Sequence, residues 1–154
     1  MDEMDSFLTS IRGQTLQYLK DNGFDARYNQ NLLDKGVYSI DVRIKQNIEY
    51  DITVISDIEV DLISVFTVDL QDVDISVLLA HKLMNEYEYL KVFVTYNSKT
   101  DNHAIVFRVQ GQEYDLMAIK IGLTTMSHSI KRYHDELCTC RHLNRDQILL
   151  DLDG

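Results

Sequence analysis

The sequence predicts an α+β fold with the order helix, three-stranded antiparallel meander, helix, hairpin and C-terminal helix. Three observations support this prediction. An apolar stripe at helical spacing opens the chain, alternating segments follow between Tyr38 and Val68, and a second helical stretch runs from Asp74 to Tyr89. A period of two marks a strand with one buried face, and a spacing of three to four marks a helix, so the order of the patterns predicts the order of the elements.

The first helix is expected to end near Asn22. Apolar residues from Met4 to Leu19 recur every three or four positions, which places them along one side of a helix. Gly23 follows Asn22, and glycine ends helices because it adopts the left-handed conformation without a steric penalty.

Two strands of the meander have a regular pattern. Residues 38 to 45 and 48 to 54 both alternate apolar with polar side chains, so each strand has one buried and one wet face. The link Gln46-Asn47 is short enough for a hairpin, and asparagine tolerates the positive φ that such turns need. These strands are therefore expected to be antiparallel.

The third strand, Ile58 to Val68, departs from this pattern. Its apolar residues Val60, Leu62 and Phe66 share one face, but Ile63 and Val65 fall on the other. A later hairpin is expected from residues 90 to 96 and 104 to 109. In it, Phe93 and Val106 are expected on the same side of the sheet as Ile63 and Val65. The candidate interface residues are Ile63, Val65, Phe93 and Val106.

This apolar patch has two interpretations. If helices cover only one side of the sheet, the patch lies on the other side and forms a dimer or partner interface. A patch of roughly 300 Å² would contribute on the order of 7 kcal/mol if it were fully buried, before the costs of association. Alternatively, a helix of the same chain covers it, and the last helix is a candidate.

The middle helix has a wide apolar arc, which implies contacts on more than one side. Asp72 or Asp74 can cap its start. Beyond it, Tyr114 to Ile121 can form a helix or a further strand. Apolar spacing from Leu116 to Leu137 favours one long helix, whereas Gly122 and the threonines after it favour a break. We expect the break, with a helix only from about residue 125 to 137.

Composition bounds the class of protein. The 154 residues, 45% of them hydrophobic and 26% charged, suit one folded domain over residues 1–143, followed by a tail or short helix over 144–154. The net charge of −10 disfavours binding to nucleic acids and to anionic membranes. The first residues lack the pattern of a signal peptide and no segment resembles a membrane span, so a cytoplasmic protein is expected.

One group of residues could bind zinc, namely His134, Cys138, Cys140 and His142. A histidine and a cysteine four residues apart share a helix face, and imidazole with thiolate suits zinc. All four residues nevertheless lie within nine consecutive positions, whereas structural zinc sites pair ligands from separated segments. We therefore expect no metal, and the two cysteines are interpreted as reduced thiols.

Other catalytic and cofactor patterns are missing from the sequence. Acidic residues gather at Asp57, Glu59 and Asp61 and at Asp69, Asp72 and Asp74, but without the glycine-containing loop of a calcium site. The sequence has neither a Gly-x-Ser-x-Gly elbow nor a glycine-rich phosphate loop. We expect no catalytic residues and no cofactor.

Two short stretches resemble a known family. They are Tyr-Leu-Lys-Asp-Asn-Gly-Phe at 18 to 24 and Leu-Leu-x-x-x-Leu-Met-Asn at 78 to 85. Together with the element order they resemble the YbjN-like family, which shares its fold with the type III secretion chaperones, over about residues 5 to 137. The resemblance implies a non-enzymatic homodimer that holds a client or effector protein against apolar surfaces, or a regulator. It implies no catalytic residues.

The sequence thus favours a non-enzymatic, chaperone-like or regulatory module that binds a protein partner and forms a homodimer. Two alternatives remain open. An immunity or inhibitor protein would bind a basic partner through its acidic surface. A zinc-dependent hydrolase would use the histidines and cysteines between residues 134 and 142.

Overall fold

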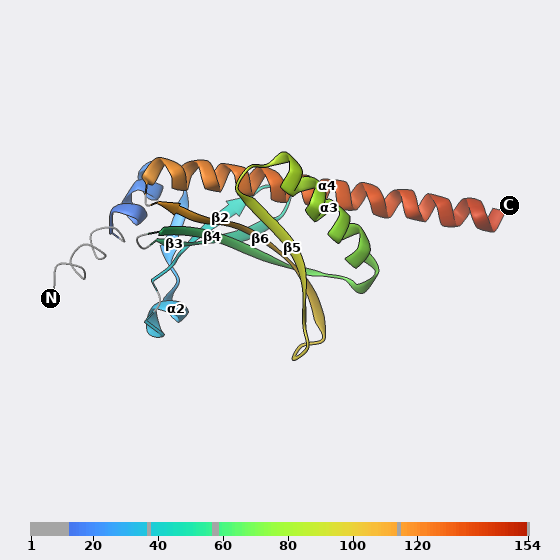
Figure 1. The fold of residues 1–154 in the computed structure, drawn as a ribbon, viewed down its shortest axis with the longest axis horizontal. Helices are drawn as coiled ribbons and strands as arrows, with labels where there is room; N and C mark the ends of the chain where they lie inside the picture. Colours follow the sequence, from blue (N-terminus) through green and yellow to red (C-terminus); the bar gives the residue numbers. More distant parts are fainter. Residues whose placement is uncertain (1–12, 37, 57–58, 114, 154) are drawn as a thin grey trace. The chain divides into compact units, whose positions relative to one another are not determined.

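The computed structural model describes residues 13–36, 38–56, 59–113 and 115–153, and it has a mixed α+β fold (Figure 1). A helix over residues 13–21 comes first. The strands are β1 (Asp25–Tyr28), β2 (Ile40–Lys45), β3 (Glu49–Ser56), β4 (Glu59–Val68), β5 (Leu90–Asn97) and β6 (Asn102–Glu113). The other helices are α2 (Gln30–Asp34), the 3-10 helix η1 (Leu70–Asp72), α3 (Val73–Glu86) and α4 (Leu116–Asp153).

The strands form one six-stranded sheet in the order β1-β2-β3-β4-β6-β5. β1, β2, β3 and β4 pair as antiparallel neighbours along the chain, with Val42 opposite Ile52 and Val54 opposite Leu62. The predicted meander is therefore confirmed, and so is the later hairpin, which Figure 1 shows as β5 and β6. The short strand β1 and the helix α2 were not predicted.

The chain divides into two compact units. Unit 1 comprises Met1–Ser64 and Arg108–Ser127, and unit 2 comprises Val65–Phe107 and His128–Gly154. The boundaries between the units fall inside β4, β6 and α4, so each of these elements has residues in both units.

The core of unit 1 is built from the faces that the period-two pattern predicts to be buried. Val42 on β2, Ile52 on β3 and Leu62 on β4 are at most 1% exposed. From the helices, Leu19 and Ile119 are fully buried. The alternation of apolar and polar residues in the sequence therefore identifies the core face of these strands correctly.

The core of unit 2 contains several aromatic side chains. Phe107 on β6 is fully buried and packs edge to face against Tyr133 of α4, with ring centroids 5.6 Å apart. The Tyr133 hydroxyl shares a 2.8 Å hydrogen bond with the hydroxyl of Ser76 on α3. This buried pair satisfies two polar groups that would otherwise cost free energy in the core.

The expected break near Gly122 is wrong, because α4 is continuous from Leu116 to Asp153. Gly122 instead allows close packing: a Cβ atom at this position would lie 3.2 Å from Cδ1 of Leu62 on β4. The glycine is needed for space and not for a turn. The predicted first turns of the opening helix, residues 4 to 12, lie outside the described residues. No helix in the described part of the chain is both long enough and apolar enough to cross a membrane.

Candidate functional site

In each unit, the part of α4 that belongs to it packs against one face of the strands. In unit 1, Leu62 of β4 packs beside Gly122 of α4. In unit 2, Phe66 of β4 lies against His134 of α4, with ring centroids 4.9 Å apart. Leu62 and Phe66 are both even-numbered positions on β4, so the odd-numbered residues between them point to the opposite side, which we call the outer face. Ile63 and Val65 belong to it, as the sequence predicts.

Two of the predicted interface residues are well exposed in unit 2. Val65 on β4 is 56% exposed and Phe93 on β5 is 46% exposed. On β5, Leu90 and Val92 are buried, and Phe93 points to the opposite face of the strand. Exposed apolar side chains that form a contiguous patch mark a site of contact with a partner.

Val106, the third predicted residue in unit 2, is only 7% exposed. It lies on β6, which has β4 and β5 as neighbours, and a face position on such an inner strand loses most of its accessible surface. The rings of Tyr96 on β5 and His103 on β6 are 4.9 Å apart, so the two strands lie side by side near the tip of the hairpin. Val106 therefore offers little surface of its own to a partner.

Ile63 lies in unit 1, where it is half-buried and sits opposite Thr53 of β3. Its neighbourhood on that strand pair is polar. It is therefore less accessible than Val65 and Phe93, and these two residues are the main exposed members of the predicted set.

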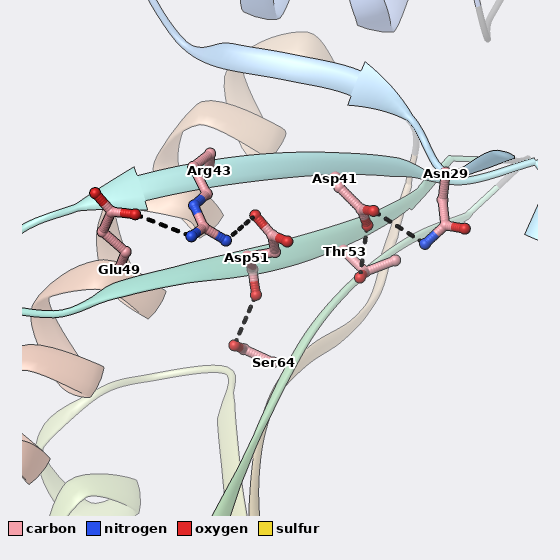
Figure 2. Close-up of polar contacts among 7 residues, drawn as sticks. All are labelled: Asn29, Asp41, Arg43, Glu49, Asp51, Thr53 and Ser64. Atoms are coloured by element: carbon pink, nitrogen blue, oxygen red, sulfur yellow. Dashed lines mark hydrogen bonds and ion pairs between the residues drawn. The ribbon is translucent and has the colours of Figure 1, made fainter. Parts of the chain in front are cut away.

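The outer face of unit 1 is charged (Figure 2). The Arg43 guanidinium on β2 donates to Glu49 at 3.0 Å and to Asp51 at 3.4 Å, both on β3. The hydrogen bond from Arg43 lowers the pKa of the Glu49 carboxyl, and the same bond raises the pKa of Arg43. On the same face, Arg108 of β6 lies 3.7 Å from Asp61 of β4.

Asp41 is held by neutral donors in the same surface. Its carboxylate accepts a 2.9 Å hydrogen bond from the Asn29 amide and a 3.0 Å bond from the Thr53 hydroxyl (Figure 2). The Asn29 side chain also caps α2, because its Oδ1 accepts from the Leu32 backbone N–H at 3.0 Å. The acidic groups of this surface are thus largely engaged within the chain, which leaves fewer of them for a basic partner.

The residues considered for zinc do not converge. His134 is half-buried between Phe66 and Tyr133, Cys138 is exposed, and Cys140 is half-buried on the same helix. Residues two apart on a helix point to different sides, so the two thiols cannot face one ion. The side chain of His142 lies outside the described part. Within that part, no group of three or more histidine, cysteine or acidic residues has the arrangement of a metal site.

One of the acidic residues considered for calcium has a different role. Asp72 is at the N-terminal end of α3, as expected, but its side chain does not cap the helix. Instead its carboxylate, which is 3% exposed, accepts hydrogen bonds from the Arg141 guanidinium of α4, one of them at 3.0 Å from Nε. Arg141 also lies 3.7 Å from Asp69. Asp57 lies outside the described residues.

The contacts between α3 and α4 in unit 2 could not be found from the sequence. Lys82 of α3 pairs with Glu136 of α4 at 2.8 Å, and Arg132 of α4 pairs with Glu86 of α3. The Lys82–Glu136 partners are 54 positions apart, and charged residues at such distances carry no pairing signal in one sequence. These pairs orient the part of α4 that covers the sheet in unit 2.

A pocket of about 220 Å³ opens in unit 2 between the end of β4 and the tip of the β5–β6 hairpin. The Tyr96 hydroxyl donates to the Asp101 carboxylate at its edge, and this bond raises the pKa of Tyr96. The pocket is lined by Thr67, Val68, Asp69, Leu70, Asp101, Asn102 and His103. Its lining is mostly polar, but it brings together no set of groups typical of a catalytic centre.

Comparison with known proteins gives a likeness of fold. No protein-family model matches the chain, and no curated protein matches it. Among solved structures, the chain is similar to YbjN from E. coli, described as a candidate transcription regulator, with a TM-score of 0.59 and 11% identity over 81% of this chain and 89% of that one. Because the identity is so low, the comparison shows the fold alone: this chain has a YbjN-like α+β fold.

Proposed function

We propose that this chain is a non-enzymatic binding module that holds a partner protein through the outer face of its sheet. The observation that supports the proposal is the pair of exposed side chains Val65 and Phe93 on the face of unit 2 opposite to α4. Burying such residues against a partner is favourable, because each removes apolar surface from water. The regulatory description of the structural neighbour agrees with a binding role.

The experiment is partner capture with the full chain and with the double variant Val65→Asp, Phe93→Asp. Proteins that co-purify with the wild-type chain from its own cells are identified by mass spectrometry. We expect the double variant to keep the circular dichroism spectrum and to lose the partner, because a carboxylate desolvated at an apolar contact costs several kcal/mol.

A matched control adds charge at apolar positions elsewhere that are at least as exposed. Leu78 on α3 is 70% exposed and Met117 on α4 is 63% exposed, so Leu78→Asp, Met117→Asp should keep the partner. If the Asp double variant does not fold, Val65→Thr, Phe93→Thr removes apolar surface with residues that suit a strand. Equal capture by a folded variant and by wild type would contradict the proposal.

The homodimer implied by the family resemblance is a second part of the proposal. Stable interfaces bury about 800 Å² on each partner, so a dimer through this face would need residues beyond Val65 and Phe93. Multi-angle light scattering on the wild-type chain and on the same double variant tests this. A mass of one chain at all concentrations would remove the dimer and leave partner capture as the separate question.

The alternative of an immunity or inhibitor protein depends on an accessible acidic surface. The net charge of −10 supports it. The ion pairs of Arg43 with Glu49 and Asp51 weigh against it on the outer face of unit 1, because these carboxylates already have a cationic partner. We therefore favour the apolar surface of unit 2 as the binding site.

A further inference from the structure

His134 lies inside the aromatic packing that joins α4 to the sheet in unit 2. Its ring is 4.9 Å from that of Phe66 on β4 and 5.0 Å from that of Tyr133, and both pairs meet edge to face. Phe66 in turn contacts Phe107 of β6, with ring centroids 5.9 Å apart. The imidazole is therefore one of the packed rings of this interface and not a solvated surface group.

One nitrogen of this ring has no hydrogen bond. Nε2 of His134 is shielded from solvent and has no partner among the described residues. In a neutral imidazole such a nitrogen is an acceptor or a donor at modest cost, but in the protonated ring both nitrogens are donors and the ring carries a charge. A buried, charged N–H without an acceptor is strongly unfavourable. The site therefore fits the neutral ring.

The charged groups around His134 do not reverse this preference. Burial is the main effect and lowers the pKa of His134, Asp135 on the same helix raises it, and Arg141 lowers it. Arg141 faces Asp72 and Asp69 from the segment that follows β4. The neighbours that β4 and β6 contribute to this packing are the uncharged rings of Phe66 and Phe107.

Glu136, two positions further along α4, is committed elsewhere. It pairs with Lys82 at 2.8 Å and with Arg132 at 3.4 Å. Both contacts are made by its Oε1, whereas its Oε2 is buried and has no hydrogen-bond partner among the described residues. Glu136 lies on a different side of the helix from His134, because residues two apart on a helix do not face each other, so it does not serve as the acceptor for the His134 ring.

We propose that His134 is an acid-sensitive switch of unit 2: protonation of its ring loosens α4 from β4 and uncovers the aromatic surface of Phe66 and Phe107. In the loosened state the imidazole is in water and takes up a proton near its ordinary pKa of about 6.5. The loosened state therefore binds more protons than the packed state as the pH falls below that value, so acid favours it. Above that pH the packed state keeps its full stability. This device is separate from the partner-binding face around Val65 and Phe93.

The size of the effect follows from proton linkage. Between the pKa of the free ring and the lower pKa of the packed ring, the equilibrium constant for loosening rises by up to about tenfold for each unit of pH. Native-state hydrogen exchange measures this constant, provided that each rate is divided by the rate of an unstructured peptide at the same pH. The amides of α4 between residues 128 and 141 report on this segment.

The experiment compares the full-length wild type with His134→Phe at about pH 7.5 and at about pH 5.5, on either side of the free-ring pKa. The phenylalanine keeps an aromatic ring and removes the titration. We expect the corrected exchange of α4 to rise in the wild type, by up to about tenfold more than in His134→Phe. His128→Gln is the matched control, because His128 is exposed on the same helix, and it should behave as the wild type does.

A second measurement keeps the proposal falsifiable if the Phe variant does not fold. His134→Gln leaves a neutral polar group at the site, and an NMR titration of the wild-type histidine rings needs no variant that alters packing. We expect the His134 ring to titrate below the ordinary histidine pKa of about 6.5. Titration of the His134 ring at or above that pKa, or the same pH dependence of exchange in the wild type and in a folded His134 variant, would overturn the switch.

Discussion

At the scale of single residues, the pair Asp72 and Arg141 shows how a buried charge constrains this chain. The carboxylate of Asp72 is 3% exposed, whereas the guanidinium of Arg141 is 51% exposed. A buried carboxylate is stable only while a cation and hydrogen-bond donors accompany it. Arg141 supplies both, so this one side chain links α4 to the start of α3.

We therefore expect Arg141→Ala to lower the free energy of unfolding by about 2–3 kcal/mol, because it leaves Asp72 buried without its partner. The half-exposed guanidinium places the value at the low end of the range for buried pairs. Urea unfolding followed by circular dichroism measures it. Lys131→Ala is the control, since its pair with Asp135 is exposed and should contribute less than about 0.5 kcal/mol. Equal losses in the two variants would show that Asp72 does not depend on Arg141.

Residue roles were predictable from the sequence where they depend on local pattern. Alternation along β4 placed Val65 on the outer face because side chains of a strand point to opposite sides in turn. The burial of Val106 was not predictable, because it depends on which strands lie beside β6. Asp72 was correctly placed at a helix start, but its partner lies 69 positions away, so no local pattern reveals it.

At the scale of elements, α4 shows why a helix can carry a glycine without ending. Helix propensity alone counts glycine as unfavourable by about 1 kcal/mol, which favoured a break. The structure has Gly122 against Leu62, where the missing side chain lets α4 approach β4. The local cost is thus offset by packing that only the folded chain reveals. Strand β1 was missed for a different reason: its four residues are too few to show a period of two.

Gly122→Val should therefore destabilise the chain by about 2–3 kcal/mol through overpacking against β4. A Cβ would already lie 3.2 Å from Cδ1 of Leu62, which is 1% exposed and has little room to move. For Gly122→Ala we expect a change within about 1 kcal/mol, because the gain in helix propensity offsets the close contact. Thermal or urea unfolding measures both.

The combined variant with Leu62→Ala separates packing from helix propensity. In that background the space beside Gly122 is larger, so the additional cost of Gly122→Val should fall by at least about half. An unchanged cost would assign the effect to the helix backbone of α4 and not to its contact with β4.

At the scale of the whole molecule, the fold was largely predictable because its elements follow one another with clear periods. The order of helix, meander, helix, hairpin and helix agrees with the structure. The net charge could also be counted from the sequence, but the positions of the charged side chains on the folded surface could not be predicted. The pairs of Arg43 and Arg108 with neighbouring carboxylates form across strands, and they show that part of the charge of −10 is compensated within the outer face of unit 1.

The salt dependence of partner capture distinguishes the apolar from the acidic mode of binding. An apolar contact through Val65 and Phe93 should persist as salt rises from about 0.1 M to about 1 M, because screening acts on charges and not on the burial of apolar surface. An acidic surface that attracts a basic partner should lose most of its affinity over that range, as exposed charges farther apart than the Debye length cease to interact. We expect capture to persist, and Arg43→Ala, which frees Glu49 and Asp51, to leave it unchanged. Capture that disappears in salt and strengthens in Arg43→Ala would instead assign binding to the charged face.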